Sequence, residues 1–385
     1  MAFPTRPAAL AAAVAAAVLL AAACDRARTA PAIGFSYNWG DESFAQFLRE
    51  EIERTRPEGG AVIRLINVDS GGWQALGASA LAAEVRRART LADDPDVVVA
   101  VGPGGSREAL LVAPVYREVS LMDLVPTATS RLLEPMSEWS PVLAPNDSLQ
   151  GEFIGQFADS ALKAKRVAIF YVPDEYGIGL ASGTAAAIER RGARVVLQTP
   201  MRLTLDCIVP NNDSMYRTLV DQAEARLAPD VAVIAARTVE AACLTRILRD
   251  RWPRLPIIAG DGTLPIKNFF DRAGSRTDGV HIVEFWHLDP TSQAALDFVQ
   301  RFERAVDRPL RHADVVYFDA TILAATAIRQ GGATREGTRR YLRSLGAERP
   351  PYQGLSGPIA FTPGFPRPIL MIRLDGGRST VVAGR

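Results

Sequence analysis

The chain has 385 residues, of which 48% are hydrophobic and 23% are charged. This length exceeds the size that one hydrophobic core usually serves, so two lobes are expected. The 44 basic and 43 acidic residues give a net charge of +1, and no cluster of Lys and Arg is interleaved with aromatic residues. This composition argues against a nucleic acid as partner and favours a small-molecule ligand.

The N-terminal segment differs in composition from the rest of the chain. Arg6 is followed by an uncharged run of Ala, Val and Leu over residues 8–23, which ends at Cys24. The run is shorter than the roughly 20 residues that a membrane-spanning helix needs, so we predict a signal peptide over residues 1–23. The alanines directly before Cys24 resemble a bacterial lipobox, although Ala21 stands where leucine is usual. We therefore expect lipidation of Cys24, a lipid-anchored linker over residues 24–31, and an extracytoplasmic (periplasmic) protein tethered to the membrane; ordinary secretion is the alternative.

The remaining cysteines leave two possibilities open. If Cys24 carries lipid, Cys207 and Cys243 form an even pair in an oxidising compartment, which permits one disulfide. They could equally be two unpaired buried thiols, because the sequence does not show whether their Cα atoms are close enough to be bridged.

The first part of the mature chain alternates β-branched runs with amphipathic helical patterns. Strands are expected over residues 32–37, 61–68, 97–101 and 121–125, and helices over residues 42–54, 76–92 and 107–118. Such a βαβα order predicts an α/β fold with a mainly parallel sheet that helices cover on both faces.

A second α/β series follows Pro145-Asn146-Asp147. Its predicted helices cover residues 148–161, 179–191, 214–227 and 239–251, and its predicted strands cover residues 167–171, 194–197, 231–235 and 257–260. The last third has helical patterns over residues 292–306, 315–329 and 335–345, followed by short strands over 359–361, 369–374 and 380–382. Helices without interleaved strands indicate that the chain returns to complete the first lobe.

Two loops in the first lobe have the chemistry of an anion site. In open parallel sheets, ligands bind outside the carboxyl ends of the strands. The strand at 97–101 runs into Gly102-Pro103-Gly104-Gly105-Ser106 and then a helix, whose first N–H groups and positive dipole end favour an anion. A P-loop is excluded because the Lys-Ser/Thr pair is missing; a plain helix cap by Ser106 is the alternative. The neighbouring loop, residues 126–130, adds hydroxyls and free backbone donors that could complete a carboxylate cradle.

These loops belong to a longer series of motifs. The series reads Tyr37-Asn38-Trp39-Gly40, Gly102-Pro103-Gly104-Gly105-Ser106, Pro126-Thr127-Ala128-Thr129, Asp174-Glu175-Tyr176-Gly177 and Ala259-Gly260-Asp261-Gly262. Over nearly the whole mature chain it resembles the leucine/isoleucine/valine-binding proteins of branched-chain amino-acid ABC transporters. The resemblance implies the type I periplasmic binding fold, with two Rossmann-like lobes with parallel sheets and three hinge crossings near residues 145, 285 and 360. We expect residues 32–145 and 286–358 in lobe 1, and residues 146–285 and 359–385 in lobe 2.

The resemblance also implies the ligand-binding residues. The ligand carboxylate would be held by Ser106, Thr127 and Thr129, and its ammonium by Asp261, whereas Trp39 and Tyr176 would pack on the ligand from opposite lobes. Without the resemblance, Asp261 beside a glycine is ordinary turn chemistry, and aromatic residues in loops are more often part of the core.

One position departs from the leucine-binding pattern. Arg237 stands where the leucine-type proteins have a tyrosine. If Arg237 faces the cleft, its guanidinium favours a polar or acidic side group on the ligand; a solvent-facing Arg237 is the other possibility.

Catalytic motifs are not apparent in the sequence. The three histidines, His281, His287 and His312, lack metal-ligand spacing, and neither H-E-x-x-H nor G-x-S-x-G occurs. We therefore predict a protein that is not an enzyme, has no metal and no cofactor, and captures an amino acid or similar small carboxylate for an ABC permease. The alternative is a ligand-sensing or protein-interaction lipoprotein of the same fold that acts on an envelope enzyme or a sensor kinase.

Overall fold

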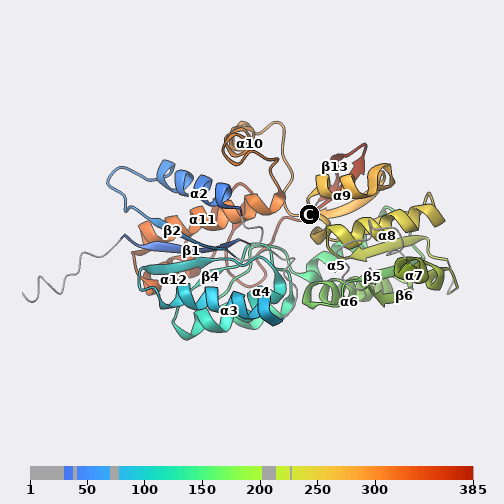
Figure 1. Ribbon diagram of the computed structural model, residues 1–385, viewed down its shortest axis with the longest axis horizontal. Helices are drawn as coiled ribbons and strands as arrows, with labels where there is room; N and C mark the ends of the chain where they lie inside the picture. Colours follow the sequence, from blue (N-terminus) through green and yellow to red (C-terminus); the bar gives the residue numbers. More distant parts are fainter. Residues whose placement is uncertain (1–29, 38–40, 70–77, 202–213, 226–227, 385) are drawn as a thin grey trace, which may run out of the picture.

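The computed structural model describes residues 30–37, 41–69, 78–201, 214–225 and 228–384. Two α/β lobes lie side by side along the long axis of the molecule (Figure 1). The expected signal peptide, Cys24, Trp39 and Cys207 lie outside the described residues. Within the described part of the chain, no helix is both long and apolar enough to cross a membrane.

The first lobe is built on a four-stranded parallel sheet in the order β2-β1-β3-β4. Its strands are β1 (Ala32–Tyr37), β2 (Arg64–Asp69), β3 (Val97–Val101) and β4 (Asp123–Leu124). Every residue of β1 and β3 is buried, as expected for strands that helices cover on both faces. The expected strand at 121–125 is shorter than its apolar run because only Asp123 and Leu124 pair with β3.

Helices from distant parts of the chain cover this sheet. One face packs against α3 (Ala78–Asp93) and α4 (Ser106–Glu118). The other packs against α2 (Glu42–Arg54), α10 (Gln293–Val306), α11 (His312–Gly331) and α12 (Arg335–Ser344). Aromatic rings bridge these segments: Phe47 of α2 lies 5.5 Å from Phe302 of α10, centroid to centroid. The C-terminal third therefore returns to the first lobe, as its lack of interleaved strands predicted.

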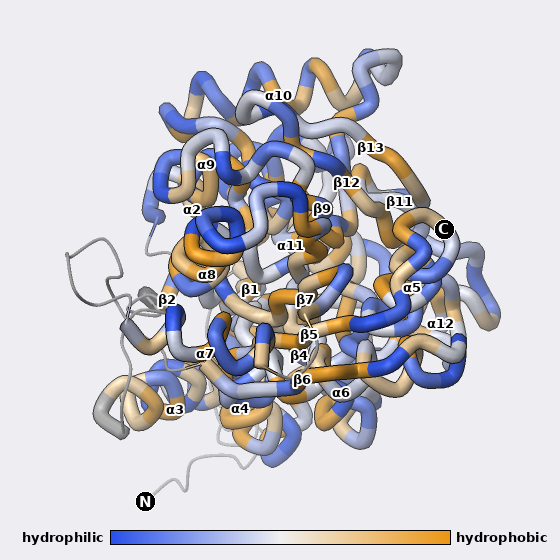
Figure 2. Tube along the Cα trace, turned by 90° about the vertical axis from the view of Figure 1, so that its right-hand side faces the viewer, coloured by the Kyte–Doolittle hydropathy of each residue, from blue (hydrophilic) through white to orange (hydrophobic). Residues whose placement is uncertain are grey.

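The second lobe contains a seven-stranded sheet in the order β13-β12-β9-β8-β7-β5-β6. The parallel strands are β5 (Arg166–Tyr171), β6 (Arg194–Pro200), β7 (Val231–Ala235), β8 (Ile257–Ala259) and β9 (Val280–Glu284). The antiparallel strands are β12 (Leu370–Asp375) and β13 (Arg378–Gly384). Figure 2 shows hydrophobic strands at the centre of this lobe and helices of mixed hydropathy around them.

The helices of the second lobe include one that the sequence did not predict. They are α5 (Asp147–Ser160), α6 (Glu175–Arg190), α7 (Ser214–Ala225), α8 (Thr238–Arg251) and α9 (Ile266–Ala273), of which α9 was missed, as was strand β9. Cys243 of α8 is buried and disulfide-bonded. An unpaired Cys243 thiol, one of the two possibilities left open by the sequence, is therefore wrong, and the other cysteines lie outside the described residues.

The chain crosses between the lobes three times. At the first crossing, Leu143 packs in the core of lobe 1 (the first core) and Ala144 packs in the core of lobe 2 (the second core). At the second crossing, Phe285 packs in the second core and Trp286 packs against the first. The third crossing lies between Phe361 in the first core and Ile369 in the second. Residues 359–361 were expected in lobe 2, but they pack in lobe 1.

The strand expected at 359–361 is also displaced. The chain instead forms a hairpin of β10 (Tyr352–Gly354) and β11 (Gly357–Ile359). The buried Asp319 carboxylate of α11 accepts hydrogen bonds from the backbone N–H groups of Leu355 and Ser356, at 2.8 and 2.7 Å. These bonds hold the turn of the hairpin on α11 and keep the following residues in the first lobe.

Candidate ligand-binding site

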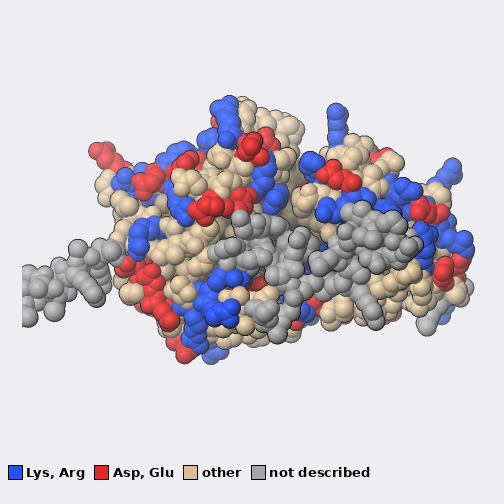
Figure 3. All heavy atoms as spheres, in the orientation of Figure 1, with Lys and Arg blue, Asp and Glu red and all other residues tan. Residues whose placement is uncertain are grey.

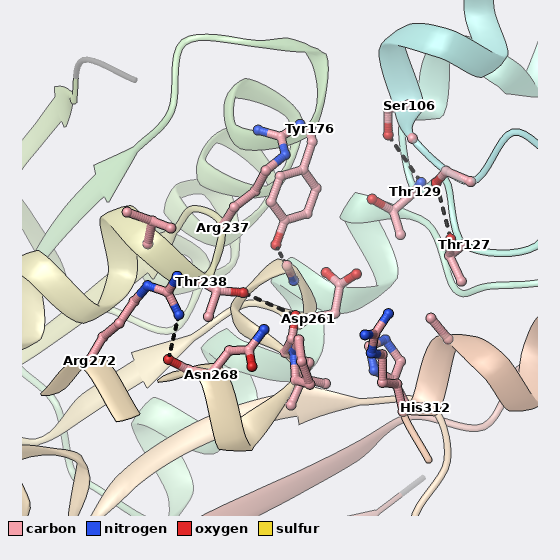
Figure 4. A pocket seen from close by; sticks show the side chains of 18 residues that line it. Ser106, Thr127, Thr129, Tyr176, Arg237, Thr238, Asp261, Asn268, Arg272 and His312 are labelled. Carbon is pink, nitrogen blue, oxygen red and sulfur yellow. Dashed lines mark hydrogen bonds between the residues drawn. The ribbon is translucent and has the colours of Figure 1, made fainter. Parts of the chain in front are cut away.

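A cavity of about 210 Å³ lies between the two lobes. Lobe 1 lines it with the start of α4, the loop after β4 and the start of α11, through Gly104, Gly105, Ser106, Thr127, Thr129, Arg311, His312 and Ala313. Lobe 2 lines it with Tyr176, Arg237, Thr238, Val239, Asp261, Gly262, Leu264, Pro265, Asn268 and Arg272. The cavity therefore brings together every residue predicted for the ligand site except Trp39, which lies outside the described residues (Figure 4).

The glycine loop is shaped by close packing. A Cβ at Gly104 would lie 2.3 Å from Thr127 Oγ1 and 2.7 Å from the Tyr317 hydroxyl, so no larger residue fits there. The Thr127 hydroxyl donates a hydrogen bond to the Gly104 carbonyl at 3.1 Å. Helix α4 has Gly105 as its N-cap, with no side-chain cap bond within the described residues. The alternative reading of Ser106 as a plain helix cap is therefore wrong, and among the described residues no side chain caps the first N–H groups of α4, whose first residues line the cavity.

The Ser106 hydroxyl oxygen binds the neighbouring loop of lobe 1. Its Oγ accepts hydrogen bonds from the backbone N–H groups of Thr129 and Ser130, at 3.2 and 3.3 Å. Two of the backbone donors expected to be free in the 126–130 loop, those of Thr129 and Ser130, are thus bound to Ser106. The Ser106 hydroxyl hydrogen remains as a donor at the cavity. The buried Thr129 hydroxyl makes no hydrogen bond of standard geometry among the described residues, but it lies close enough to the Asp147 carboxyl to oppose the rise in its pKa.

Asp261 and Tyr176 form one unit on the opposite lobe. Asp261 lies two residues after the end of β8 and is 7% exposed. The Tyr176 hydroxyl accepts a hydrogen bond from the backbone N–H of Gly262 at 2.9 Å. Burial raises the pKa of Asp261 to about 6, while hydrogen bonds from Tyr176 and Gln150 oppose that shift. Burial also raises the pKa of the neighbouring Asp147 carboxyl, at the start of α5.

Arg237 lies in the cavity wall. Its guanidinium forms an ion pair with Asp174, which is 5% exposed. The same guanidinium lies 5.8 Å from the centroid of the Tyr176 ring, within the range of a cation–π contact. Asp174 also caps α6 by accepting a hydrogen bond from the Gly177 N–H at 2.9 Å. Because Asp174 compensates its charge, Arg237 is a weaker selector of acidic ligands than the sequence suggested.

Sequence reasoning missed the contributions of α11 and α9. An ionic network positions the start of α11: Arg308 donates to Asp41 at 2.7 Å and to Asp314 at 2.6 Å, and the Tyr37 hydroxyl donates to Asp314. This network joins the ends of β1 and α11 and brings His312 to the cavity. Burial lowers the pKa of His312 to about 4, so its imidazole is neutral near pH 7.

Arg272 and Asn268 of α9 also line the cavity. Their helix has eight residues, which is shorter than the window in which helical periodicity is readable, so no sequence signal pointed to them. Within the described residues, no group of three or more His, Cys, Asp or Glu side chains could hold a metal ion. The site offers hydroxyl and N–H donors on one lobe and a carboxyl on the other, which suits a ligand with one anionic and one cationic group.

Two α/β lobes joined by three chain crossings, with a polar cavity at their junction, are the features of the type I periplasmic binding fold. A family model described as periplasmic binding protein matches residues 55–370, and the chain belongs to this family. An amino acid binding protein of Pseudomonas aeruginosa is 26% identical over 170 residues, which cover 43% of this chain and 44% of that protein. The chain thus matches less than half of that relative's length.

Solved structures confirm the predicted fold. A leucine binding protein of Thermotoga maritima superposes with a TM-score of 0.76 at 19% identity, covering 92% of this chain and 98% of that chain. The branched-chain amino acid transporter substrate binding protein of Streptococcus pneumoniae, in complex with isoleucine, has a TM-score of 0.76 at 17% identity, covering 92% of this chain and 99% of that chain. A solute binding protein of R. palustris in complex with benzoate has a TM-score of 0.75 at 16% identity, covering 92% of this chain and 96% of that chain.

Proposed function

We propose that this protein is an extracytoplasmic solute-binding lipoprotein, anchored through Cys24, that captures an amino acid or related small carboxylate and delivers it to an ABC permease. The observation that carries the proposal is the placement of Ser106, Thr127 and Thr129 on one lobe and Asp261 on the other, all lining one cavity. The similar structures that hold isoleucine and benzoate support a small carboxylate as ligand. The role is binding and not catalysis.

The division of the site between lobes suggests how capture works. A carboxylate held by the lobe 1 hydroxyls and an ammonium held by Asp261 would make the ligand a bridge between lobes. Three chain crossings permit closure by hinge bending. The ion pair of Arg107 in α4 with Glu175 in α6, at 2.8 Å, already links the two lobes beside the cavity. Acidic and basic side chains are interspersed on both lobes of the face in Figure 3, without a single-sign surface for a polyanion.

A thermal-shift screen of amino acids, small carboxylates and amides on the purified protein tests the capture function. A ligand at 100 times its dissociation constant should add about 2.7 kcal/mol to the free energy of unfolding. Replacing Thr129 with Ala should remove most of this shift, because the buried hydroxyl that faces the ligand carboxylate is lost. Thr90→Ala, at an exposed hydroxyl of α3 that donates to the Arg86 carbonyl of the same helix, is the matched control and should keep the full shift. A full shift in Thr129→Ala contradicts the assigned carboxylate site.

Amino-acid binding should weaken as the pH falls through about 6. Burial raises the pKa of Asp261 to about 6, and only its ionised form can pair with a ligand ammonium. Below that pH a proton competes with the ligand, so the affinity should fall by up to about tenfold per pH unit. Titration calorimetry from about pH 5 to about pH 8 measures this dependence. The same affinity across that range would show that the ligand does not pair with Asp261.

A further inference from the structure

The cavity wall contains cations that differ in how their charges are compensated. Arg237 is paired with Asp174. Charged residues elsewhere on the same side of lobe 2 are also paired: Lys267 lies 2.6 Å from Asp271, and Arg276 lies 2.8 Å from Asp250. Arg272 of α9 forms no ion pair within the described part of the chain.

The hydrogen bonds of Arg272 are also incomplete. Its Nη1 donates to the backbone carbonyl of Asn268 at 3.2 Å, one helical turn earlier. Its Nε is buried and has no hydrogen-bond partner among the described residues. A buried donor that has lost water and gained no partner costs about 1–3 kcal/mol. A guanidinium that lies on the wall of a ligand cavity with an unpaired buried donor is suited to bind an anionic group of the ligand.

The position of Arg272 defines which part of the ligand it would meet. In Figure 4, Arg272 and Asn268 lie on one side of the cavity, Ser106 and Thr129 lie on the other, and Asp261 lies between them. A ligand with its carboxylate at Ser106 and Thr129 and its ammonium at Asp261 would therefore direct its side chain toward α9. Thr238, Asn268 and Arg272 contribute polar groups to the part of the cavity lining that α8 and α9 provide, beside the apolar Val239, Leu264 and Pro265.

We propose that the preferred ligand is an amino acid whose side chain ends in an anionic group, and that Arg272 binds this group with Asn268 beside it. The proposal rests on the proposed capture of an amino acid. It assigns the selection of an acidic side chain to Arg272 and leaves Arg237 as a positioning residue that holds Tyr176 and the start of α6. An aliphatic side chain in the same place would leave the buried Nε of Arg272 without an acceptor, so leucine should bind poorly.

The test compares L-aspartate and L-glutamate with their neutral isosteres L-asparagine and L-glutamine and with L-leucine, by titration calorimetry on the full chain. At least one of the two acids should bind about 10- to 100-fold more tightly than its amide and than leucine. Arg272→Gln should remove that preference and change the affinity for the amide and for leucine by less than about threefold. Lys267→Gln removes a positive charge from the exposed side of the same helix and should leave the preference unchanged.

The outcomes separate this proposal from the capture function. If an amide or leucine binds as tightly as the acids, or if Arg272→Gln weakens all ligands equally, selection by Arg272 is wrong while amino-acid capture stands. If none of the five amino acids binds but the thermal-shift screen finds another carboxylate, the acidic amino acid is wrong and capture of a small carboxylate stands. If the screen finds no ligand at all, both proposals fail.

Discussion

Replacing Asp261 with Asn should strongly weaken ligand binding and, at the same time, stabilise the ligand-free protein near neutral pH. Burial raises the pKa of Asp261 to about 6, from an ordinary value of 3.8. The raised pKa means that burial favours the neutral carboxyl over the ionised one, so the contribution of this group to stability is present in full below about pH 4, where both the folded and the unfolded state are protonated. That contribution is lost as the pH rises to about 6, where the buried carboxyl ionises. At neutral pH the ionised carboxylate lowers the free energy of unfolding by up to about 3 kcal/mol.

Asn keeps the shape of the side chain and removes the charge. The free energy of unfolding should therefore rise by about 1–3 kcal/mol near neutral pH, and the gain should shrink toward about pH 4. Loss of the buried partner for the ammonium should weaken binding by at least about 30-fold. Urea unfolding at the two pH values and titration calorimetry measure both effects.

Asp271→Asn is the matched control for this prediction. Asp271 lies on the exposed side of α9 and pairs with Lys267, so its replacement should change neither binding nor the pH dependence of stability. Retained binding in Asp261→Asn would show that the carboxyl does not hold the ligand. A gain in stability that is equal at both pH values would show that the buried charge is not its cause.

Asp174→Ala should have the largest effect on stability, a loss of about 3–5 kcal/mol in the free energy of unfolding. Asp174 is 5% exposed, pairs with Arg237 and caps α6 through the Gly177 N–H. Its removal leaves the largely buried guanidinium of Arg237 without a counter-ion and also removes a helix cap worth about 1 kcal/mol. Since Arg237 lies against Tyr176, ligand affinity should fall as well.

The double variant Asp174→Asn with Arg237→Met separates the ion pair from the cap. Asn retains the cap, and methionine removes the charge that Asp174 compensates, so most of the stability lost in Asp174→Ala should return. Urea unfolding of the single and double variants measures the coupling. The ion pair contributes little if Asp174→Ala lowers the free energy of unfolding by less than about 1 kcal/mol, or if the double variant is no more stable than the Asp174→Ala variant.

Much of the fold was predictable because the signals are local. Alternation of β-branched strands with amphipathic helices predicted both α/β lobes, and strand ends followed by glycines and hydroxyls predicted the lobe 1 side of the cavity. The predictions failed where the structure depends on which segments of the chain pair with one another. Strand β9 was missed, and the strand expected at 359–361 became a hairpin that the buried Asp319 holds on α11.

The sequence by itself determined the lobes, the glycine loop and, through its resemblance to a family, the placement of Thr129 and Asp261 on opposite sides of one cavity. Only the tertiary structure decided that Ser106 satisfies the backbone of the neighbouring loop, that Asp174 compensates Arg237, and that Arg272 enters the same cavity. The physical reason is that backbone conformation and hydrophobic periodicity depend on residues close in the chain. The partner of a buried charge depends on which surfaces of two separately folded sheets meet, and no local pattern carries that information.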